Sequence, residues 1–165
     1  MHDVDDLIKL FNRCFELDYQ TRLIKGGMEP IYQPADGECA YHRIIFTFDY
    51  FSSALHECAH WFIAGEKRRQ CVDYGYWYAP DGRSAEQQRR FQAAEIKPQA
   101  LEWILATAAC YPFQVSFDNL NGEIRDAEAF QQAVLQQVQR YHEHGLPPRA
   151  EQFYRALSAF YTPKK

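Results

Sequence analysis

The sequence predicts an α+β fold that is mostly helical, with a small β-sheet beside one helix that carries an HExxH segment. Three observations predict this fold. Long stretches place apolar residues at helical spacing, short stretches are rich in β-branched and aromatic residues, and His56-Glu57-Cys58-Ala59-His60 has the spacing of a metal-binding helix. The 165 residues are 47% hydrophobic and 24% charged, so we expect one domain, residues 1–165, with its own core.

The first half of the chain predicts one helix and two strands. Val4–Phe15 has apolar residues at helical spacing behind an Asp-rich start, which suits the helix dipole. Residues 25–37 are rich in Gly and Pro and predict turns or a long loop that could border a site. His42–Tyr50 predicts a buried strand, and the alternation over Val72–Tyr78, closed by the turn at residues 79–82, predicts a second one.

The second half predicts helices. Ser84 followed three residues later by Gln87 has the spacing of a capping box and predicts a helix start. Pro98 is expected to start a new helix or to kink this one, and the apolar face continues as far as Pro112. Two further helices are expected over Asp126–His144 and Arg149–Tyr161.

Charge and cysteine usage exclude several classes of protein. A net charge of −4 argues against binding to nucleic acid or to anionic membranes, because those surfaces attract concentrated Lys and Arg. The sequence has no apolar run long enough to cross a membrane and opens without the pattern of a signal peptide, so we expect a cytoplasmic protein. The cysteines are odd in number and form no CxxC pair, so they are expected to be reduced thiols: Cys14, Cys39, Cys58, Cys71 and Cys110.

The HExxH segment is the strongest functional signal. Residues four apart lie one above the other on a helix, so the imidazoles of His56 and His60 can bind one metal ion from consecutive turns. Ser52 or Ser53 can cap the start of this helix, and Gly65 suits its end. The local sequence therefore predicts a helix that presents two metal ligands.

A catalytic metal needs a third protein ligand from another segment. The acidic candidates are Glu66, Asp73, Glu86, Glu95 and Glu102. Glu95 ranks first because small and apolar neighbours would let it approach the HExxH helix, whereas Glu66 ranks second because it belongs to a charged turn. Glu102, seven residues after Glu95, would share its face of a continuous helix and could accept a hydrogen bond from a ligand histidine.

The motif by itself is compatible with a zinc-dependent metallopeptidase. In that reaction Glu57 would be the general base that activates a metal-bound water against a peptide carbonyl. A helix-borne HExxH is typical of the zincin peptidases, so we expect a zincin-like core.

Three stretches together resemble the bacterial elongation factor P hydroxylase family, and the resemblance extends over essentially the whole chain. They are Ser53–Arg69, which contains HExxH, then Asp73–Tyr78, and Ala94–Trp103, which contains both Glu95 and Glu102. HExxH alone is shared with many metallopeptidases, whereas this combination is not.

The resemblance implies a non-haem iron protein hydroxylase that uses dioxygen and acts on the lysine of elongation factor P already extended by a β-lysyl group. His56 and His60 would then be ligands of Fe(II), and Glu95 would be the carboxylate ligand. Two histidines and one carboxylate leave open positions on Fe(II) for dioxygen and substrate. Glu57 would lie beside the metal.

Overall fold

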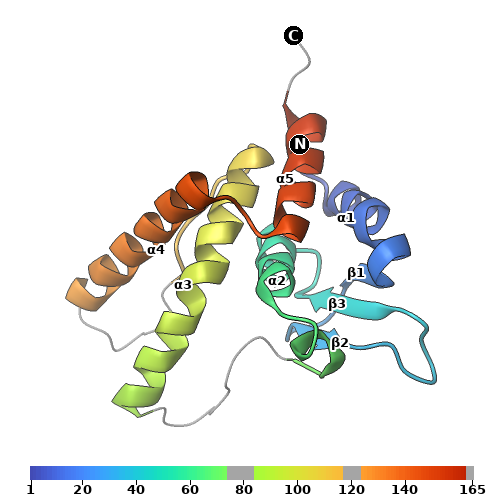
Figure 1. Cartoon of the computed structure of the whole chain (residues 1–165), viewed down its shortest axis with the longest axis horizontal. Coiled ribbons are helices and arrows are strands. Elements are labelled where there is room, and N and C mark those ends of the chain that lie inside the picture. The colour runs from blue at the N-terminus through green and yellow to red at the C-terminus, as the bar shows by residue number, and fades with distance from the viewer. Residues whose placement is uncertain (74–83, 117–123, 163–165) are drawn as a thin grey trace.

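The computed structural model describes residues 1–73, 84–116 and 124–162, and Figure 1 shows how their elements are arranged. The prediction of a mostly helical α+β fold with a small sheet is confirmed. The elements in chain order are α1 (Val4–Tyr19), β1 (Thr21–Lys25), β2 (Ile31–Gln33), β3 (His42–Phe46), α2 (Phe51–Ile63), the 3-10 helix η1 (Arg68–Gln70), α3 (Ala85–Ala108), α4 (Ile124–His144) and α5 (Pro148–Tyr161).

The three described strands form one sheet in the order β1-β3-β2. β1 is parallel to β3, with Thr21 opposite His42, and β2 is antiparallel to β3, with Ile31 opposite Ile45. The prediction that residues 25–37 form only turns or a loop was wrong, because β2 lies inside this stretch. The predicted strand over residues 72–78 lies outside the described residues from Tyr74 onward.

The predicted strand His42–Tyr50 is shorter in the structure, because the chain turns sharply after Phe46. Phe48 adopts a left-handed backbone conformation with φ of 46°, which no strand accommodates. The turn brings the chain directly into α2. The sheet therefore positions the start of the HExxH helix.

α2 begins three residues earlier than a Ser53 cap would place it. Its N-cap residue is Tyr50, which makes no side-chain capping hydrogen bond, so the prediction of a serine cap was wrong. The Ser53 hydroxyl instead accepts a hydrogen bond from the Thr47 backbone N–H at 3.0 Å. At the other end the cap is Ala64 in an extended conformation, so Gly65 does not end the helix.

α3 is one helix of 24 residues that starts at the predicted capping box of Ser84 and Gln87. Pro98 lies inside it and does not start a new helix. The loss of one backbone hydrogen bond at a proline is tolerated here, because the helix is anchored on both sides by buried neighbours such as Leu101. Continuity matters for function, since it keeps Glu95 and Glu102 on one face.

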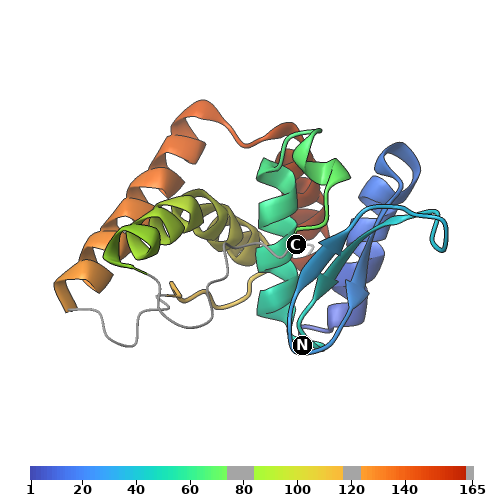
Figure 2. The same ribbon diagram turned by 90° about the horizontal axis from the view of Figure 1, so that it is seen from below.

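The main core lies where α1, α2 and α5 meet the sheet. Its largest buried side chains are aromatic: Phe11, Phe15, Phe46, Phe62 and Phe153. A second apolar cluster joins α3 to α4. Figure 2 shows α2 between the sheet on one side and α3 on the other, so α2 is buried on several faces and presents one face to α3. None of the described helices is long and apolar enough to cross a membrane.

Candidate metal centre

The two histidines of HExxH lie on the face of α2 that is turned toward α3. The other faces of this helix are packed by fully buried residues such as Leu55, Cys58 and Ala59. Cys58 therefore belongs to the core, and burial raises the pKa of its thiol well above the ordinary value. Only His56, Glu57 and His60 of the motif remain to face a ligand.

α3 supplies two carboxylates opposite these histidines. Glu95 lies 3.0 Å from His60 Nε2 through Oε1 and 3.4 Å from His56 Nε2 through Oε2. Glu102 lies 2.9 Å from His56 Nδ1 and can accept the hydrogen of that ring nitrogen. The expectation that Glu95 and Glu102 share one face of a continuous helix next to HExxH is confirmed.

The donor atoms of His56, His60 and Glu95 converge, and all three residues have a ligand atom within 4.8 Å of one another. The two Nε2 atoms of the histidines are 3.0 Å apart. Ligand atoms that each lie about 2.1 Å from one metal ion are separated by about 3.0 to 3.4 Å, depending on the coordination angle. The observed separations match this range, so the residues fit a single divalent cation.

The charges around the histidines favour a cation. Burial lowers the pKa of His56, but the hydrogen bond and charge of Glu102, together with the charges of Glu95 and Glu57, outweigh it and raise the pKa to about 10. For Glu95 burial raises the pKa, yet the hydrogen bond from His60 and the charge of His56 bring it below the ordinary value. The same carboxylates would stabilise the positive charge of a metal ion bound between the histidines.

Glu95 is buried, with 7% of its surface exposed, and is held by a second residue of α3. The amide of Gln99 lies 3.5 Å from Glu95 Oε2 and donates at 2.8 Å to the Ser116 carbonyl. The Ser116 backbone N–H donates in return to Gln99 Oε1 at 3.0 Å. Gln99 therefore fixes both the carboxylate and the segment that follows α3.

A cleft of about 360 Å³ opens onto the donor cluster. Its polar lining consists of carboxylates, amides, hydroxyls and the two imidazoles of the HExxH segment, and none of the described lining residues is a lysine or arginine. The lining residues are Pro30, Thr47, Ser52, Ser53, His56, Glu57, His60, Phe91, Gln92, Glu95, Gln99, Glu102, Gln114, Ser116 and Phe130. The size and charge of this cleft suit a long, positively charged side chain.

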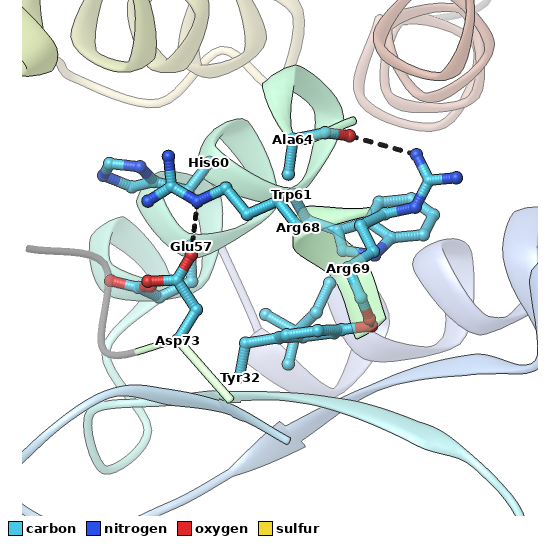
Figure 3. A pocket seen from close by; sticks show the side chains of 9 residues that line it. Tyr32, Glu57, His60, Trp61, Ala64, Arg68, Arg69 and Asp73 are labelled. Carbon is cyan, nitrogen blue, oxygen red and sulfur yellow. Dashed lines mark hydrogen bonds and ion pairs between the residues drawn. The ribbon is translucent and has the colours of Figure 1, made fainter. Parts of the chain in front are cut away.

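Figure 3 shows a much smaller recess that Glu57 and His60 also line. Arg68 and Asp73, joined by an ion pair of 2.6 Å, line this recess together with Tyr32. Its volume of about 30 Å³ has room for about one water molecule.

Glu57 differs from the other two carboxylates. It lines both the cleft and the recess, and it forms no hydrogen bond or ion pair with any residue that the structure describes. Burial raises the pKa of Glu57, against the lowering effect of His56 and His60. Its side chain thus lies beside the two histidines and lines the cleft with them.

The other acidic candidates do not join the donor cluster. Glu66 is exposed beyond the end of α2, and Glu86 is exposed in the first turn of α3, where Arg90 binds it at 2.8 Å. Asp73 pairs with Arg68.

Sequence reasoning missed two residues that support the site. Gln99 could have been found from its position, four residues after Glu95 on the same helical face. Arg149 could not, because it lies on α5 and reaches the end of α2, 85 to 88 residues earlier in the chain. Its guanidinium donates to the carbonyls of Trp61, Phe62 and Ala64.

Comparison with known proteins gives a consistent result. The sequence pattern of the family described as elongation factor P hydroxylase matches residues 10–165. The elongation factor P lysine hydroxylase of Haemophilus influenzae is 57% identical over 161 residues, which are 98% of this chain and 90% of the relative. The identity and the coverage are both far above what a shared fold alone produces. The chain belongs to the elongation factor P hydroxylase family.

Proposed function

We propose that this chain hydroxylates a lysine of elongation factor P, with one Fe(II) ion bound by His56, His60 and Glu95. The observation that carries the proposal is the convergence of two imidazoles and one carboxylate at 3.0 to 3.4 Å in a chain of this family. Two histidines and a carboxylate are the ligand set of non-haem iron oxygenases. When bound, Fe(II) would supply the redox chemistry with dioxygen that hydroxylation of a C–H bond requires.

The protein's own residues orient the ligands and shape the cleft. Glu102 accepts from His56 Nδ1 and so directs Nε2 toward the donor cluster. Gln99 holds Glu95 in position. The proposed substrate side chain is a lysine already extended by a β-lysyl group. Its ammonium groups suit a cleft whose lining includes Glu57 and, among the described residues, no lysine or arginine.

Incubation of the iron-loaded protein with β-lysylated elongation factor P and dioxygen tests this function. The expected result is a gain in the mass of the modified peptide equal to one oxygen atom. No gain with iron-loaded wild-type protein and a supplied reductant would contradict the proposal. Protein loaded with zinc is the matched control and is expected to produce no gain, because zinc has no redox chemistry.

Substitution of Glu102 with glutamine tests the role of this carboxylate as a positioning residue. The variant keeps the size of the side chain but removes its charge, so His56 becomes a less basic ligand. We expect the dissociation constant for the metal to rise by about 10- to 100-fold. Titration with Co(II) as a spectroscopic probe measures this change, and the exposed Glu143→Gln serves as control. An unchanged dissociation constant would refute the role.

Substitution of Glu57 with glutamine separates hydroxylation from the peptidase alternative. A zinc peptidase needs Glu57 as general base, whereas hydroxylation assigns it no proton transfer. We expect Glu57→Gln to keep its metal and to retain hydroxylation within about tenfold of wild type, a change of at most about 1.4 kcal/mol in the barrier. The mass assay measures the rate. Peptide cleavage by wild-type protein that disappears in Glu57→Gln would favour the peptidase.

A further inference from the structure

The mouth of the cleft must contact more than the reacting side chain, because the proposed substrate lysine belongs to a folded protein. This inference rests on the proposed function. The lining of the cleft includes Pro30 just before β2, Thr47 just after β3, and Ser52 in the first turn of α2. Residues between and beside them are therefore next to the body of any protein whose lysine enters the cleft.

Three large apolar side chains are exposed on the segments that carry these lining residues, and together they are named the rim patch. Met28 is 81% exposed, Phe48 is 42% exposed and Tyr50 is 54% exposed. The rings of Phe48 and Tyr50 contact each other at a centroid distance of 5.6 Å. Met28 follows Gly27, whose carbonyl accepts the Phe48 backbone N–H at 3.1 Å. The three side chains thus belong to one corner of the molecule.

The backbone of this corner is held in an unfavourable conformation. Phe48 has a φ of 46°, and a bulky residue adopts such a value only where its surroundings enforce it. The Thr47 N–H is bound by Ser53 Oγ and the Tyr50 N–H by the Thr47 carbonyl. Because the strained turn places an aromatic ring in solvent and not in the core, folding alone does not explain it.

Gly26 permits the close approach that this corner needs. Its backbone N–H donates to the Phe46 carbonyl at 2.9 Å, and a Cβ atom there would lie 2.3 Å from Ile45 Cγ2. Any larger residue would push the 26–30 segment away from β3. The 26–30 segment is therefore held closely against β3. Aromatic side chains on segments held in place in this way bind partners at a low cost in conformational entropy.

The charge of this region suits a partner that presents a lysine. Glu29 follows Met28 and Asp49 follows Phe48, both are exposed, and the lining of the cleft contains three further carboxylates. The nearby Lys25 is already bound to Asp5 at 2.6 Å. A protein with a positively charged arm meets complementary charge both on the rim and in the cleft.

We propose that the rim patch is the surface on which the folded body of elongation factor P docks while its modified lysine enters the cleft. The patch residues lie within two positions in the chain of Pro30, Thr47 and Ser52, which line the cleft that would receive this side chain. It is small for a stable dimer, since three side chains provide well below the roughly 800 Å² per partner of a standard interface. A transient enzyme–substrate contact, in which the cleft adds further contact area, needs no larger patch.

Binding of β-lysylated elongation factor P to the iron-loaded Phe48→Asn/Tyr50→Ser variant tests the proposal. Asparagine tolerates the left-handed conformation, so the turn is kept while the rings are removed. Biolayer interferometry is expected to give a dissociation constant about tenfold higher than that of wild type. Iron content and the maximal hydroxylation rate at saturating substrate are expected to stay unchanged.

Leu17→Asn on α1 is the matched control, because Leu17 is 92% exposed and lies outside both the rim patch and the cleft lining. It is expected to bind like wild type. Equal binding by the double variant and wild type would overturn the proposal, as would a wild-type dimer that the double variant abolishes. Wild-type protein that binds but does not hydroxylate would instead refute the proposed function and leave the docking surface in place.

Discussion

Replacement of His60 with alanine is expected to abolish hydroxylation while leaving the fold intact. His60 Nε2 lies 3.0 Å from both His56 Nε2 and Glu95 Oε1, so its removal takes away the ligand that contacts both others. A metal centre lowers the activation barrier of its reaction by several kcal/mol. Its loss is therefore expected to reduce the hydroxylation rate by at least about 10³-fold. Alanine favours helix, so α2 remains formed.

The measurement for this variant is the rate of oxygen incorporation together with the metal content per chain. His142→Ala is the control, because His142 is exposed near the end of α4 and is expected to retain full activity. A His60→Ala protein that still binds one metal ion and hydroxylates at the wild-type rate would show that the donor cluster is misassigned.

Replacement of Arg149 with methionine is expected to lower the free energy of unfolding by about 2 to 4 kcal/mol, because three carbonyls at the end of α2 lose a charged donor. The guanidinium binds the carbonyls of Trp61, Phe62 and Ala64 at 2.7 to 3.2 Å and lies over the Trp61 ring at 4.3 Å. Burial, and then the charge of Arg69, lowers its pKa to about 10, so Arg149 remains a cation at neutral pH.

Urea unfolding followed by circular dichroism measures this loss. Because His60 is in the last turn of α2, the metal dissociation constant is expected to rise in the same variant. Arg155→Met is the matched control on α5: its ion pair with Glu151 is exposed and contributes at most about 1 kcal/mol. Equal stability of the two variants would contradict the capping role of Arg149.

The sequence predicted the helices well, because their signals are local. The capping box at Ser84 and the apolar spacing of α5 both depend on residues a few positions apart. β1 and β2 escaped prediction, since their pairing with β3 is set by contacts across the sheet and their own sequences are short. The extension of α1 to Tyr19 likewise depends on the packing of that ring against Trp61.

The candidate site was predictable where chemistry and helical spacing coincide. His56 and His60 were predicted from the motif and Glu95 from its small and apolar neighbours, whereas Glu102 was placed by its seven-residue separation from Glu95 on a continuous helix. The support from Arg149 and the outward turn at Phe48 were not predictable. Both depend on segments that only folding brings together, namely α5 with α2 and residues 26–30 with 47–50.

Metal analysis of the purified protein tests the central claim most directly. The protein should be prepared without chelators and without nickel affinity chromatography, and iron should be quantified per chain in wild type and in Glu95→Ala. Binding by His56, His60 and Glu95 predicts one iron ion per wild-type chain and its loss in the variant. Full retention of the metal by Glu95→Ala would contradict the assignment of the third ligand.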